Sequence, residues 1–202
     1  KNRIFVDRTK GVGVITSEEA ISYGFTGPCL RSPGVGYDVR KAQPYMVYDR
    51  MDFEVPVGTK GDNYDRYLCR MEEMEQSMRI IEQALVALPA GPVKVADNRI
   101  TFPTKQEVYS NMESLIHHFK LLMYDHGIRP PKGEVYQAVE GANGELGFYL
   151  VSDGTDRPYR LRCRGPCFYI MSGLSRMING GMIADIVPTF GSMNMIGGEC
   201  DR

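Results

Sequence analysis

Apolar residues recur at every third or fourth position between residues 62 and 88, which is the spacing of one face of an α-helix. Asp62 follows Gly61 and suits the N-cap, and the Pro-Ala-Gly-Pro run at 89–92 interrupts the pattern. We therefore predict a long helix over 62–88 and interpret its apolar stripe as core rather than as part of a cofactor site. The stripe consists of Tyr64, Leu68, Met71, Met74, Met78, Ile81, Leu85 and Leu88.

A second helix is predicted over 105–124, because apolar residues again recur at helical spacing before Gly127. His117 and His118 are neighbours on this helix and point about 100° apart, so they cannot both face one metal ion. We interpret His117 as a packing residue, with Glu113 one turn away to orient its ring. The expected buried face carries Met112, Leu115, Ile116, Phe119, Leu122 and Met123.

Residues 133–165 change to a period of two, which is typical of β-strands. Asn143-Gly144 and Asp153-Gly154 lie between the alternating runs, where the chain should reverse. This pattern predicts an antiparallel three-stranded meander. Together with the long helices it indicates a helix-dominated α+β architecture, in which a small sheet packs on helices.

Residues 1–60 are rich in Gly, Pro and Tyr, and we expect a loop-rich segment with one short helix near Ser17–Tyr23. Within this segment, charged and aromatic residues crowd positions 37–45. A buried pair of Asp38 and Arg40 would fix the geometry of this loop. A loop of such composition is more often the wall of a site or an interface than a free linker.

Residues 168–202 are predicted to form two short helices, separated at Asn179-Gly180-Gly181 and bent by Pro188, followed by an apolar tail. The tail at 191–202 mixes Met, Ile and Gly before a charged end. Terminal segments are usually polar, because a short one rarely buries enough surface to offset its ordering. We therefore expect this tail to lie either in the protein's own core or against an apolar ligand cavity.

Composition narrows the class of function. The formal net charge of -1 over 202 residues gives no general attraction to nucleic acid. No apolar run approaches the ~20 residues that span a bilayer, and five cysteines are too few and too scattered for a disulfide scaffold. The phosphate-binding glycine motifs and the spacing of soft metal ligands are both missing from the sequence. We expect no nucleic-acid partner and no metal bound by this chain.

Two groups of residues have a plain structural interpretation beside a functional one. Arg160, Arg162 and Arg164 alternate along one predicted strand and share a face. That face is either solvated and salt-bridged or a docking face for an acidic partner. Cys163 and Cys167 are separated by one residue more than the redox motif requires, so we interpret them as small buried residues.

Short runs along the whole chain are similar to one known family. They are Ile4-Phe5, the runs at 8–13 and 23–27, Leu30-Arg31, the run at 37–41, Pro44-Tyr45, the run at 55–58, Gly61-Asp62, the run at 64–66, Arg70, Glu73-Met74, the runs at 134–136, 144–147, 151–154 and 157–160, and Asp201-Arg202. These residues resemble the C-terminal half of the D-subunit family of proton-pumping NADH:quinone oxidoreductase (respiratory complex I). The chain starts at Lys1, without Met, so we expect it to be a piece of a longer polypeptide.

The resemblance implies a fold like that of the nickel–iron hydrogenase large subunit, in which two terminal cysteines hold the metal. Ile196 and Glu199 stand at those positions here, so the thiolates that a soft metal needs are missing. The resemblance implies that this place is instead an apolar cavity for a quinone head group, lined by Met193, Asn194, Met195, Ile196 and Gly197. Three further residues are implied to support the surrounding loops or the interface, namely Arg31, Asp38 and Arg40.

The resemblance further implies a subunit of a membrane-associated, proton-translocating NADH:quinone oxidoreductase. NAD would bind elsewhere in the assembly, and a 4Fe-4S cluster held by the iron–sulfur B subunit would lie beside the cavity. Other peripheral-arm subunits and the membrane-arm H subunit would be neighbours. The family's His and Tyr that contact quinone lie in the other half, so we expect no catalytic residue here and no activity from this chain alone. The expected location is peripheral, on the cytoplasmic side of the bacterial inner membrane or the matrix side in mitochondria.

Two alternatives belong to other classes. In one, the chain is a structural module of the same assembly whose tail is core and never touches quinone. In the other, it is a large subunit related to the membrane-bound hydrogenases, which the missing thiolates disfavour. The direction of the side chains at 193–198 separates the first alternative from a quinone cavity.

Overall fold

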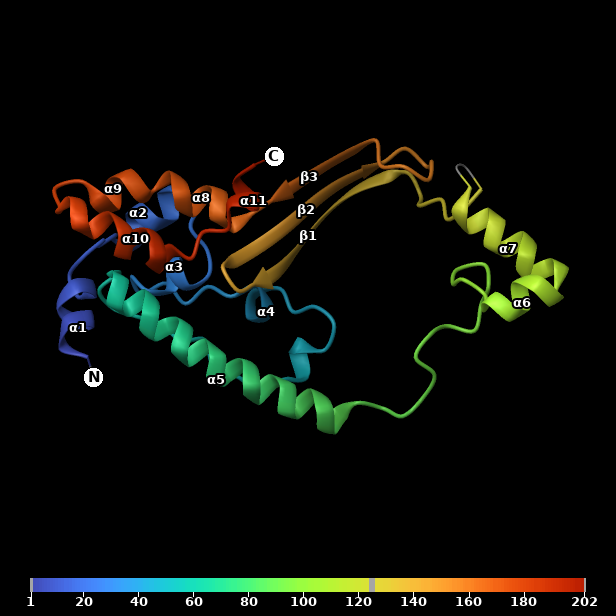
Figure 1. Ribbon diagram of the computed structural model, residues 1–202, viewed down its shortest axis with the longest axis horizontal. Coiled ribbons are helices and arrows are strands. Elements are labelled where there is room, and N and C mark those ends of the chain that lie inside the picture. The colour runs from blue at the N-terminus through green and yellow to red at the C-terminus, as the bar shows by residue number, and fades with distance from the viewer. Residues whose placement is uncertain (1, 124–125, 202) are drawn as a thin grey trace. The chain divides into compact units, whose positions relative to one another are not determined.

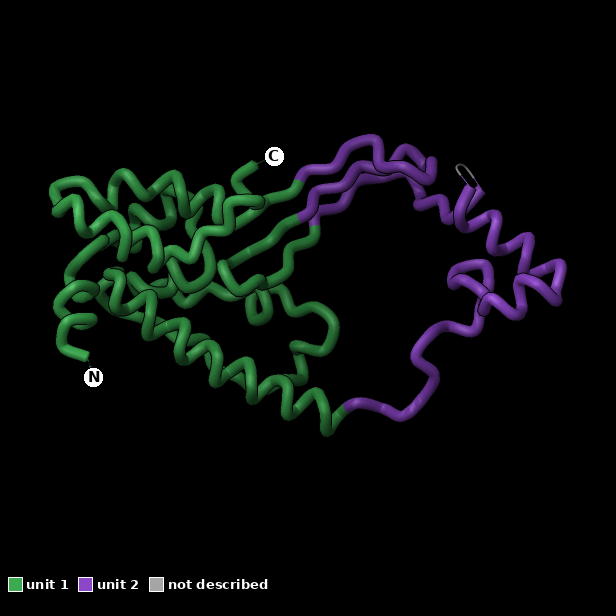
Figure 2. Tube along the Cα trace, in the orientation of Figure 1, with its two compact units in different colours: residues 1–87, 137–147, 163–202 green, residues 88–136, 148–162 purple. Residues whose placement is uncertain are grey.

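The computed structural model describes residues 2–123 and 126–201 and divides the chain into two compact units (Figure 2). Unit 1 comprises residues 1–87, 137–147 and 163–202, and unit 2 comprises residues 88–136 and 148–162. Tyr124, the last residue of the second predicted helix, and Arg202 at the end of the tail lie outside the described residues. Helices and one small sheet make up the secondary structure, so the α+β class predicted from the sequence is confirmed.

The long helix α5 runs Asn63–Ala87 (Figure 1). Asp62 lies directly before it, and its Oδ1 accepts a hydrogen bond from the backbone N–H of Asp65 at 2.8 Å, which satisfies one of the free donors of the first turn. The other carboxylate oxygen of Asp62 accepts from the backbone N–H of Gly11 at 2.7 Å and ties the helix start to the N-terminal segment.

The interpretation of the apolar stripe on α5 as core is wrong for this chain. Leu68, Met71, Met74, Met78, Ile81 and Leu85 are between 43% and 69% exposed. The buried residues of α5 are instead Asn63, Arg66 and Cys69. Spacing identifies which side of a helix is apolar, but polar contacts made by residues far away in the sequence decide which side faces this unit.

The described part of residues 1–60 contains five short helical elements. Four are α-helices and one is a single 3-10 turn within that segment, more than the one helix expected. Their bounds are α1 Arg3–Thr9, α2 Ser17–Ser22, α3 Pro28–Arg31, α4 Val39–Ala42 and η1 Tyr48–Arg50, and α8, which spans Pro166–Ser172, follows the sheet. Thr16 caps α2 in a capping box with Glu19, which fits the short helix predicted there.

The remaining helices of unit 1 are α9 Leu174–Ile178, η2 Ile183–Asp185, α10 Ile186–Met193 and α11 Gly197–Cys200. The helical run is broken around Gly180, as the sequence predicts, but three α-helices and a 3-10 turn cover the described residues 168–190 where two short helices were expected. Pro188 lies in the first turn of α10, where a missing backbone N–H costs no intrahelical hydrogen bond. One cluster of buried apolar residues joins these helices to the N-terminal ones, formed by Ile15, Ala20, Phe25, Cys29, Leu30, Ile170, Met177 and Met193.

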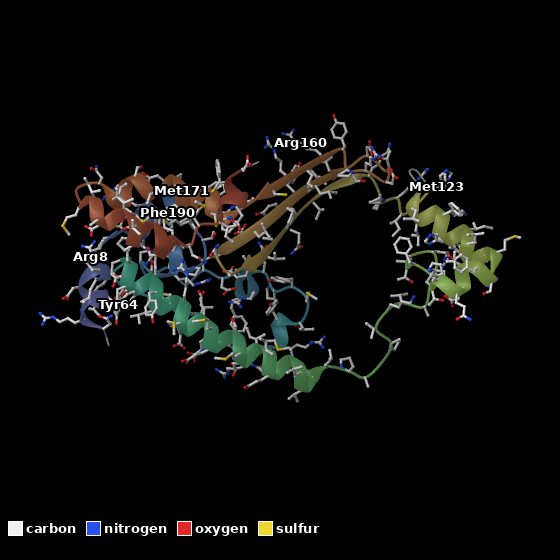
Figure 3. The ribbon with its side chains drawn as sticks, in the orientation of Figure 1. Arg8, Tyr64, Met123, Arg160, Met171 and Phe190 are labelled. Atoms are coloured by element: carbon white, nitrogen blue, oxygen red, sulfur yellow. The ribbon has the colours of Figure 1, made fainter. Side chains whose placement is uncertain are left out.

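The sheet has three strands in the order β1-β2-β3, with bounds Gly133–Gly141, Gly144–Ser152 and Arg160–Arg164. These strands lie within the predicted meander at 133–165. Arg164 donates from its guanidinium to the carbonyl oxygens of Glu145 and Gly24, both at 2.9 Å. Arg160 is exposed (Figure 3). The three arginines of β3 therefore have different surroundings, because Arg164 binds backbone carbonyls of unit 1 whereas Arg160 is exposed.

Unit 2 contains two helices where one was predicted over 105–124. They are α6 Lys105–Ser110 and α7 Met112–Leu122. Asn111 separates them, because its Oδ1 caps the start of α7 and its backbone is extended. Ile116, Phe119 and Leu122 on α7 are exposed, so the expectation that this face is buried is also wrong for this chain.

Candidate functional site

The C-terminal segment leaves α10 through a left-handed residue. Met193, the last residue of α10, is fully buried in the apolar cluster of unit 1. Asn194 follows with φ 54° and ψ 46°, a conformation that asparagine tolerates better than most residues. The backbone therefore turns sharply between Met193, whose side chain is core, and the residues that follow.

Polar contacts, rather than apolar packing, hold the residues after Met193. Asn143 at the β1–β2 turn donates from Nδ2 to the carbonyl of Asn194 at 3.0 Å, and Asn194 donates from Nδ2 to Asn143 Oδ1 at 2.9 Å. Cys167 accepts at its sulfur from the backbone N–H of Ile196 at 3.4 Å. Its own backbone N–H donates to Glu199 Oε2 at 3.0 Å. These bonds fix the path of the segment while leaving its apolar side chains outside the core.

The five predicted cavity residues have different surroundings. Met193 is core, Met195 is half-buried, and Asn194 and Gly197 are exposed. Ile196 is 52% exposed although it is aliphatic. An exposed aliphatic side chain on a segment whose backbone is held in place is well suited to contact a second apolar surface.

A hollow of about 440 Å³ in unit 1 lies next to this segment. Its wall is mostly apolar and is contributed by α1, α5, α10 and the residue after α10. Figure 1 shows these three helices in unit 1, and Figure 3 labels Tyr64 on α5 and Phe190 on α10. The lining residues are Phe5, Thr9, Asn63, Tyr67, Arg70, Pro188, Gly191, Ser192 and Asn194. Of the predicted cavity residues, Asn194 is the one that lines it.

Behind the hollow, Arg66 is fully buried and binds neutral oxygens. Its guanidinium donates to the carbonyls of Gly13 at 2.6 Å and Gly61 at 2.9 Å, and to side-chain oxygens of Asn63 at 2.5 Å and Ser192 at 3.0 Å. Burial is the largest effect on this group and lowers the pKa of Arg66. These bonds join the loops at Gly13 and Gly61 to α5 and α10.

Arg70 lies one turn beyond Arg66 on α5 and lines the hollow itself. Its Nη2 donates to the carbonyl of Met193 at 3.2 Å, a favourable place for a cation because it is the C-terminal end of α10. Its Nη1 has a long bond of 3.4 Å to the carbonyl of Arg66. Its buried Nε has no hydrogen-bond partner among the residues that the structure describes.

A second ionic cluster is centred on Arg31, which is 1% exposed. Arg31 donates from Nε to Glu73 at 2.8 Å and from Nη1 to Glu140 at 3.0 Å, and its Nη1 lies 3.5 Å from Asp38. Arg40 in turn binds Asp38 through Nη2 at 2.6 Å. The predicted Asp38–Arg40 pair is thus present, and all three predicted support residues belong to one cluster.

Burial controls the acid–base properties of this cluster. It raises the pKa of both Glu73 and Glu140, because it outweighs the opposing charge of Arg31. Burial also acts on Asp38, but the hydrogen bonds and charge of Arg40 outweigh it, so the pKa of Asp38 is lowered. The cluster therefore holds one firmly ionised carboxylate and two that accept protons more readily than usual.

Sequence reasoning missed Arg66, Arg70, Glu73, Glu140 and Asn143. A signal existed for the first three, because Arg66, Arg70 and Glu73 recur at spacings of four and three and therefore share one side of α5. Glu140 and Asn143 gave no such signal, since their partners lie on other elements.

Comparison with known proteins identifies the family. The family described as respiratory-chain NADH dehydrogenase, 49 kDa subunit, matches residues 1–202. A D subunit of the NADH-quinone oxidoreductase of Sorangium cellulosum, numbered 1, is 60% identical over all of this chain and 50% of its own length. The corresponding D subunit of Myxococcus xanthus is 58% identical over all of this chain and 48% of its own length. A fused C/D subunit of Bdellovibrio bacteriovorus is 55% identical, with 36% of its length covered.

The chain belongs to the 49 kDa subunit family of respiratory-chain NADH dehydrogenase. The resemblance stated from the sequence is therefore confirmed. The chain spans about half the length of the first two of these relatives. Within the part of this family member that the structure describes, every helix is too short or too polar to cross a lipid bilayer. In the same part, His, Cys, Asp and Glu side chains form no group of three or more that could hold a metal ion.

The cysteines of this family member differ in their surroundings, since Cys69 and Cys167 are buried whereas Cys200 and Cys163, which was expected to be buried, are partly exposed. Burial raises the pKa of Cys69 and of Cys167 to about 11. At pH 8 only roughly one such thiol in a thousand is the reactive thiolate. In native protein treated with iodoacetamide at pH 8, we expect the partly exposed Cys163 and Cys200 to react first and Cys69 and Cys167 to stay unmodified.

Peptide mass spectrometry checks this expectation, with denatured protein as the control in which all five cysteines react. Native labelling of Cys167 as fast as that of Cys200 would contradict the position given to Cys167 beneath the C-terminal segment.

Proposed function

We propose that this chain is part of a membrane-associated NADH:quinone oxidoreductase and forms one wall of the chamber for the quinone head group. The relatives' names support the activity, since they are NADH-quinone oxidoreductase subunits. In this proposal quinone is the substrate, and this chain itself holds neither NAD nor an iron–sulfur cluster. The chain has a hydrogenase-large-subunit-like fold in which Ile196 and Glu199 replace the two metal-binding cysteines.

One observation carries the proposal: the segment after α10 has a fixed backbone and an exposed aliphatic side chain. Asn143 and Cys167 hold that backbone through hydrogen bonds, and the side chain of Glu199 in the same segment accepts from the backbone N–H of Cys167. Ile196 is exposed on it, and Asn194 lines the hollow beside it. A quinone head group is flat and largely apolar, and sites for such molecules combine apolar walls with a few placed polar groups.

The partners proposed for the chamber follow from the same family membership. The iron–sulfur B subunit would carry the terminal 4Fe-4S cluster beside the chamber, other peripheral-arm subunits would surround it, and the membrane-arm H subunit would lie on the membrane side. We place the chain peripherally on the cytoplasmic face of the bacterial inner membrane, or on the matrix side in a mitochondrion. Arg31, Asp38 and Arg40 would hold the loops at the edge of the chamber.

A structural role without quinone contact is the second candidate, and the exposed apolar stripe on α5 favours it. A stripe that reaches from Leu68 to Leu85 is too extensive to be left in water, so it suits a protein contact. The two roles are compatible in one subunit, but only the first requires that residues 194–197 touch quinone.

Ile196→Trp in the complete oxidoreductase tests the chamber. The larger ring would occupy space that the head group needs, so we expect a quinone-analogue inhibitor to bind at least about tenfold more weakly, with the subunit still assembled. Inhibitor titration of NADH:quinone activity measures the effect. Ile183→Trp is the control, since Ile183 is an isoleucine of unit 1 that is more exposed than Ile196 (87% against 52%) and lies outside the segment at 193–197.

Equal inhibitor sensitivity and turnover in the Ile196→Trp and unmodified enzymes would reject the chamber and leave the structural role. Equal weakening by Ile183→Trp would show a general effect of added bulk instead.

A further inference from the structure

The hollow between α1, α5 and α10 contains a cation whose charge is not balanced by a contacting carboxylate. Arg70 lines the hollow, and Arg66 lies one turn behind it on the same side of α5. Among the described residues, the hydrogen-bond acceptors of both guanidinium groups are neutral oxygens and one sulfur. No Asp or Glu belongs to the lining that the described part of the chain forms. Two neighbouring cations in a partly dehydrated site attract an anion strongly.

The carboxylates close enough to act on these arginines are already engaged elsewhere. Glu73 binds Arg31 at 2.6 Å. Asp62 accepts from the backbone N–H groups of Gly11 and Asp65. Asp65, which also acts on Arg66, accepts from the backbone N–H groups of Thr59 and Lys60. None of these three carboxylates forms an ion pair with Arg66 or Arg70 among the described residues.

Arg70 also has donor capacity to spare. A guanidinium has five N–H groups. Nη2 of Arg70 donates to the carbonyl of Met193 and to Cys29 Sγ at 3.9 Å, Nη1 makes one long bond, and the buried Nε makes none among the described residues. Nε is covered by this chain's own atoms, so the donor capacity open to a ligand lies on Nη1, which carries two N–H groups and makes a single long bond.

We propose that this hollow receives the carboxylate of an Asp or Glu from a segment of the family's subunit that lies outside the part this chain spans. The relatives carry about as much sequence again beyond the matched region. The segment would be apolar around its acidic residue, because Phe5, Tyr67 and Pro188 form the wall and Met71 and Met74 extend an exposed apolar surface along α5. The carboxylate would bind Arg70 through Nη1, whose one hydrogen bond is long.

A protein carboxylate suits the site better than a charged form of the substrate. The positive charge of Arg70 is permanent, so a permanent counter-charge stabilises the fold at all times. An anionic quinol oxygen would be present only during turnover and would leave the cation unbalanced between cycles. The proposal therefore does not depend on whether residues 194–197 contact quinone.

Zero-length cross-linking of the complete oxidoreductase tests the proposal directly. Arg70→Lys places a primary amine in the hollow, and a carbodiimide then joins that amine to a carboxylate in contact with it. We expect a cross-linked peptide that joins position 70 to an Asp or Glu of the same subunit outside the sequence of this chain. Arg79→Lys is the control, because Arg79 forms an ion pair with Asp52 and the expected link from position 79 is to Asp52.

A second variant keeps the test decisive if the lysine side chain is too short to reach. Arg70→Met removes the charge while keeping an unbranched side chain, and it should leave the partner carboxylate buried and unpaired. We expect roughly tenfold less assembled subunit, or more, by quantitative mass spectrometry. Replacing the cross-linked acid, or each acid of the other half in turn, by its amide should restore most of that loss in the Arg70→Met background.

A link from position 70 to Glu73 or Asp62 would overturn the proposal. The proposal would also be overturned if the Arg70→Met enzyme assembles normally and the Arg70→Lys enzyme gives no cross-link at position 70, although the Arg79→Lys control gives the expected cross-link to Asp52. Normal assembly combined with a raised KM for quinone would also reject it, and would assign the hollow to an anionic form of the substrate.

Discussion

Replacing Arg31 by methionine is expected to lower the free energy of unfolding by about 3–5 kcal/mol. The side chain is 1% exposed and contacts three carboxylates, from Asp38, Glu73 and Glu140. Methionine preserves much of the apolar stem but none of the charge. The cost comes from leaving three negatively charged groups in a buried place with Arg40 as the one remaining cation of the cluster.

The three carboxylates come from distant parts of the chain, so Arg31 has a connecting role. Asp38 begins α4, Glu73 lies on α5, and Glu140 lies on β1. Glu140 also accepts from the backbone N–H of Val39 at 3.1 Å, which joins the strand to α4. Loss of Arg31 therefore loosens three elements at once, and we expect a lower melting temperature for all of unit 1 rather than a local defect.

The stability lost in Arg31→Met should become smaller as the pH falls. Glu73 and Glu140 have pKa values raised by burial, so the folded protein binds protons at these groups more readily than the unfolded chain does. Without Arg31 both pKa values rise further, because its charge opposes the effect of burial. The deficit of Arg31→Met should therefore shrink as the pH is lowered from 7 towards 5, before acid protonates Asp38 and removes its contribution.

Urea unfolding of the protein at several pH values, followed by circular dichroism, measures both effects. Arg79→Met is the matched control, since Arg79 forms an exposed pair with Asp52 and such pairs contribute about 0–1 kcal/mol. Equal losses for the two variants would show that burial of the Arg31 cluster does not matter. A deficit that grows on acidification would contradict the assigned direction of the two glutamate pKa values.

Elements were predictable from this sequence where the deciding information is local. The period of three to four residues and the breaker at 89–92 located the helix that the structure places at Asn63–Ala87, and alternation around Asn143-Gly144 located the first hairpin of the sheet. Asp38 and Arg40 are two residues apart, so their pairing was also open to sequence reasoning.

Contacts between distant residues explain what sequence reasoning did not find. Arg66 is buried because Gly13, 53 residues away, and Ser192, 126 residues away, both accept from its guanidinium. Those contacts turn the polar side of α5 inward and leave its apolar stripe exposed. Periodicity alone identifies an apolar stripe but not the surface that covers it, which explains why the stripe was assigned to the core.

In the candidate site, too, local features could be predicted from the sequence and contacts between distant residues could not. The resemblance to a known family singled out residues 193–197, and the apolar composition of the tail agreed with it. The sequence did not reveal that Asn143 and Cys167 hold this segment, since these residues are 51 and 29 positions from the groups they bind. Nor did it reveal the hollow, whose wall combines residues near position 5, position 67 and position 191.

Gly27→Ala is the other substitution with a large expected effect, and it acts through these same long-range contacts. Gly27 precedes α3 with φ 65° and ψ −150°, a backbone conformation that is essentially restricted to glycine. A Cβ at this position would lie 2.5 Å from Gly144 Cα and 2.6 Å from the carbonyl oxygen of Asn143. Both are backbone atoms of the β1–β2 turn, so no side-chain rotation relieves the overlap.

We expect Gly27→Ala to destabilise unit 1 by roughly 3 kcal/mol or more, since backbone strain and displacement of the turn add together. The turn is bound to this place by the backbone N–H of Glu145, which donates to Thr26 Oγ1 at 3.0 Å. Moving the turn would also move Asn143, whose side chain holds Asn194 at the C-terminal segment. A change at position 27 should therefore loosen residues that are far away in the sequence.

Hydrogen–deuterium exchange of the protein distinguishes this coupling from simple loss of stability. In Gly27→Ala, peptides covering residues 143–147 and 194–199 should exchange faster than in the unmodified protein, while those of the outer turns of α5 change little. Gly91→Ala is the control, because a Cβ there meets open space and the residue has no left-handed backbone. Unchanged protection of residues 194–199 beside a deprotected turn would show that Asn143 does not hold the C-terminal segment, and the fixed backbone on which the quinone chamber depends would have to come from other contacts.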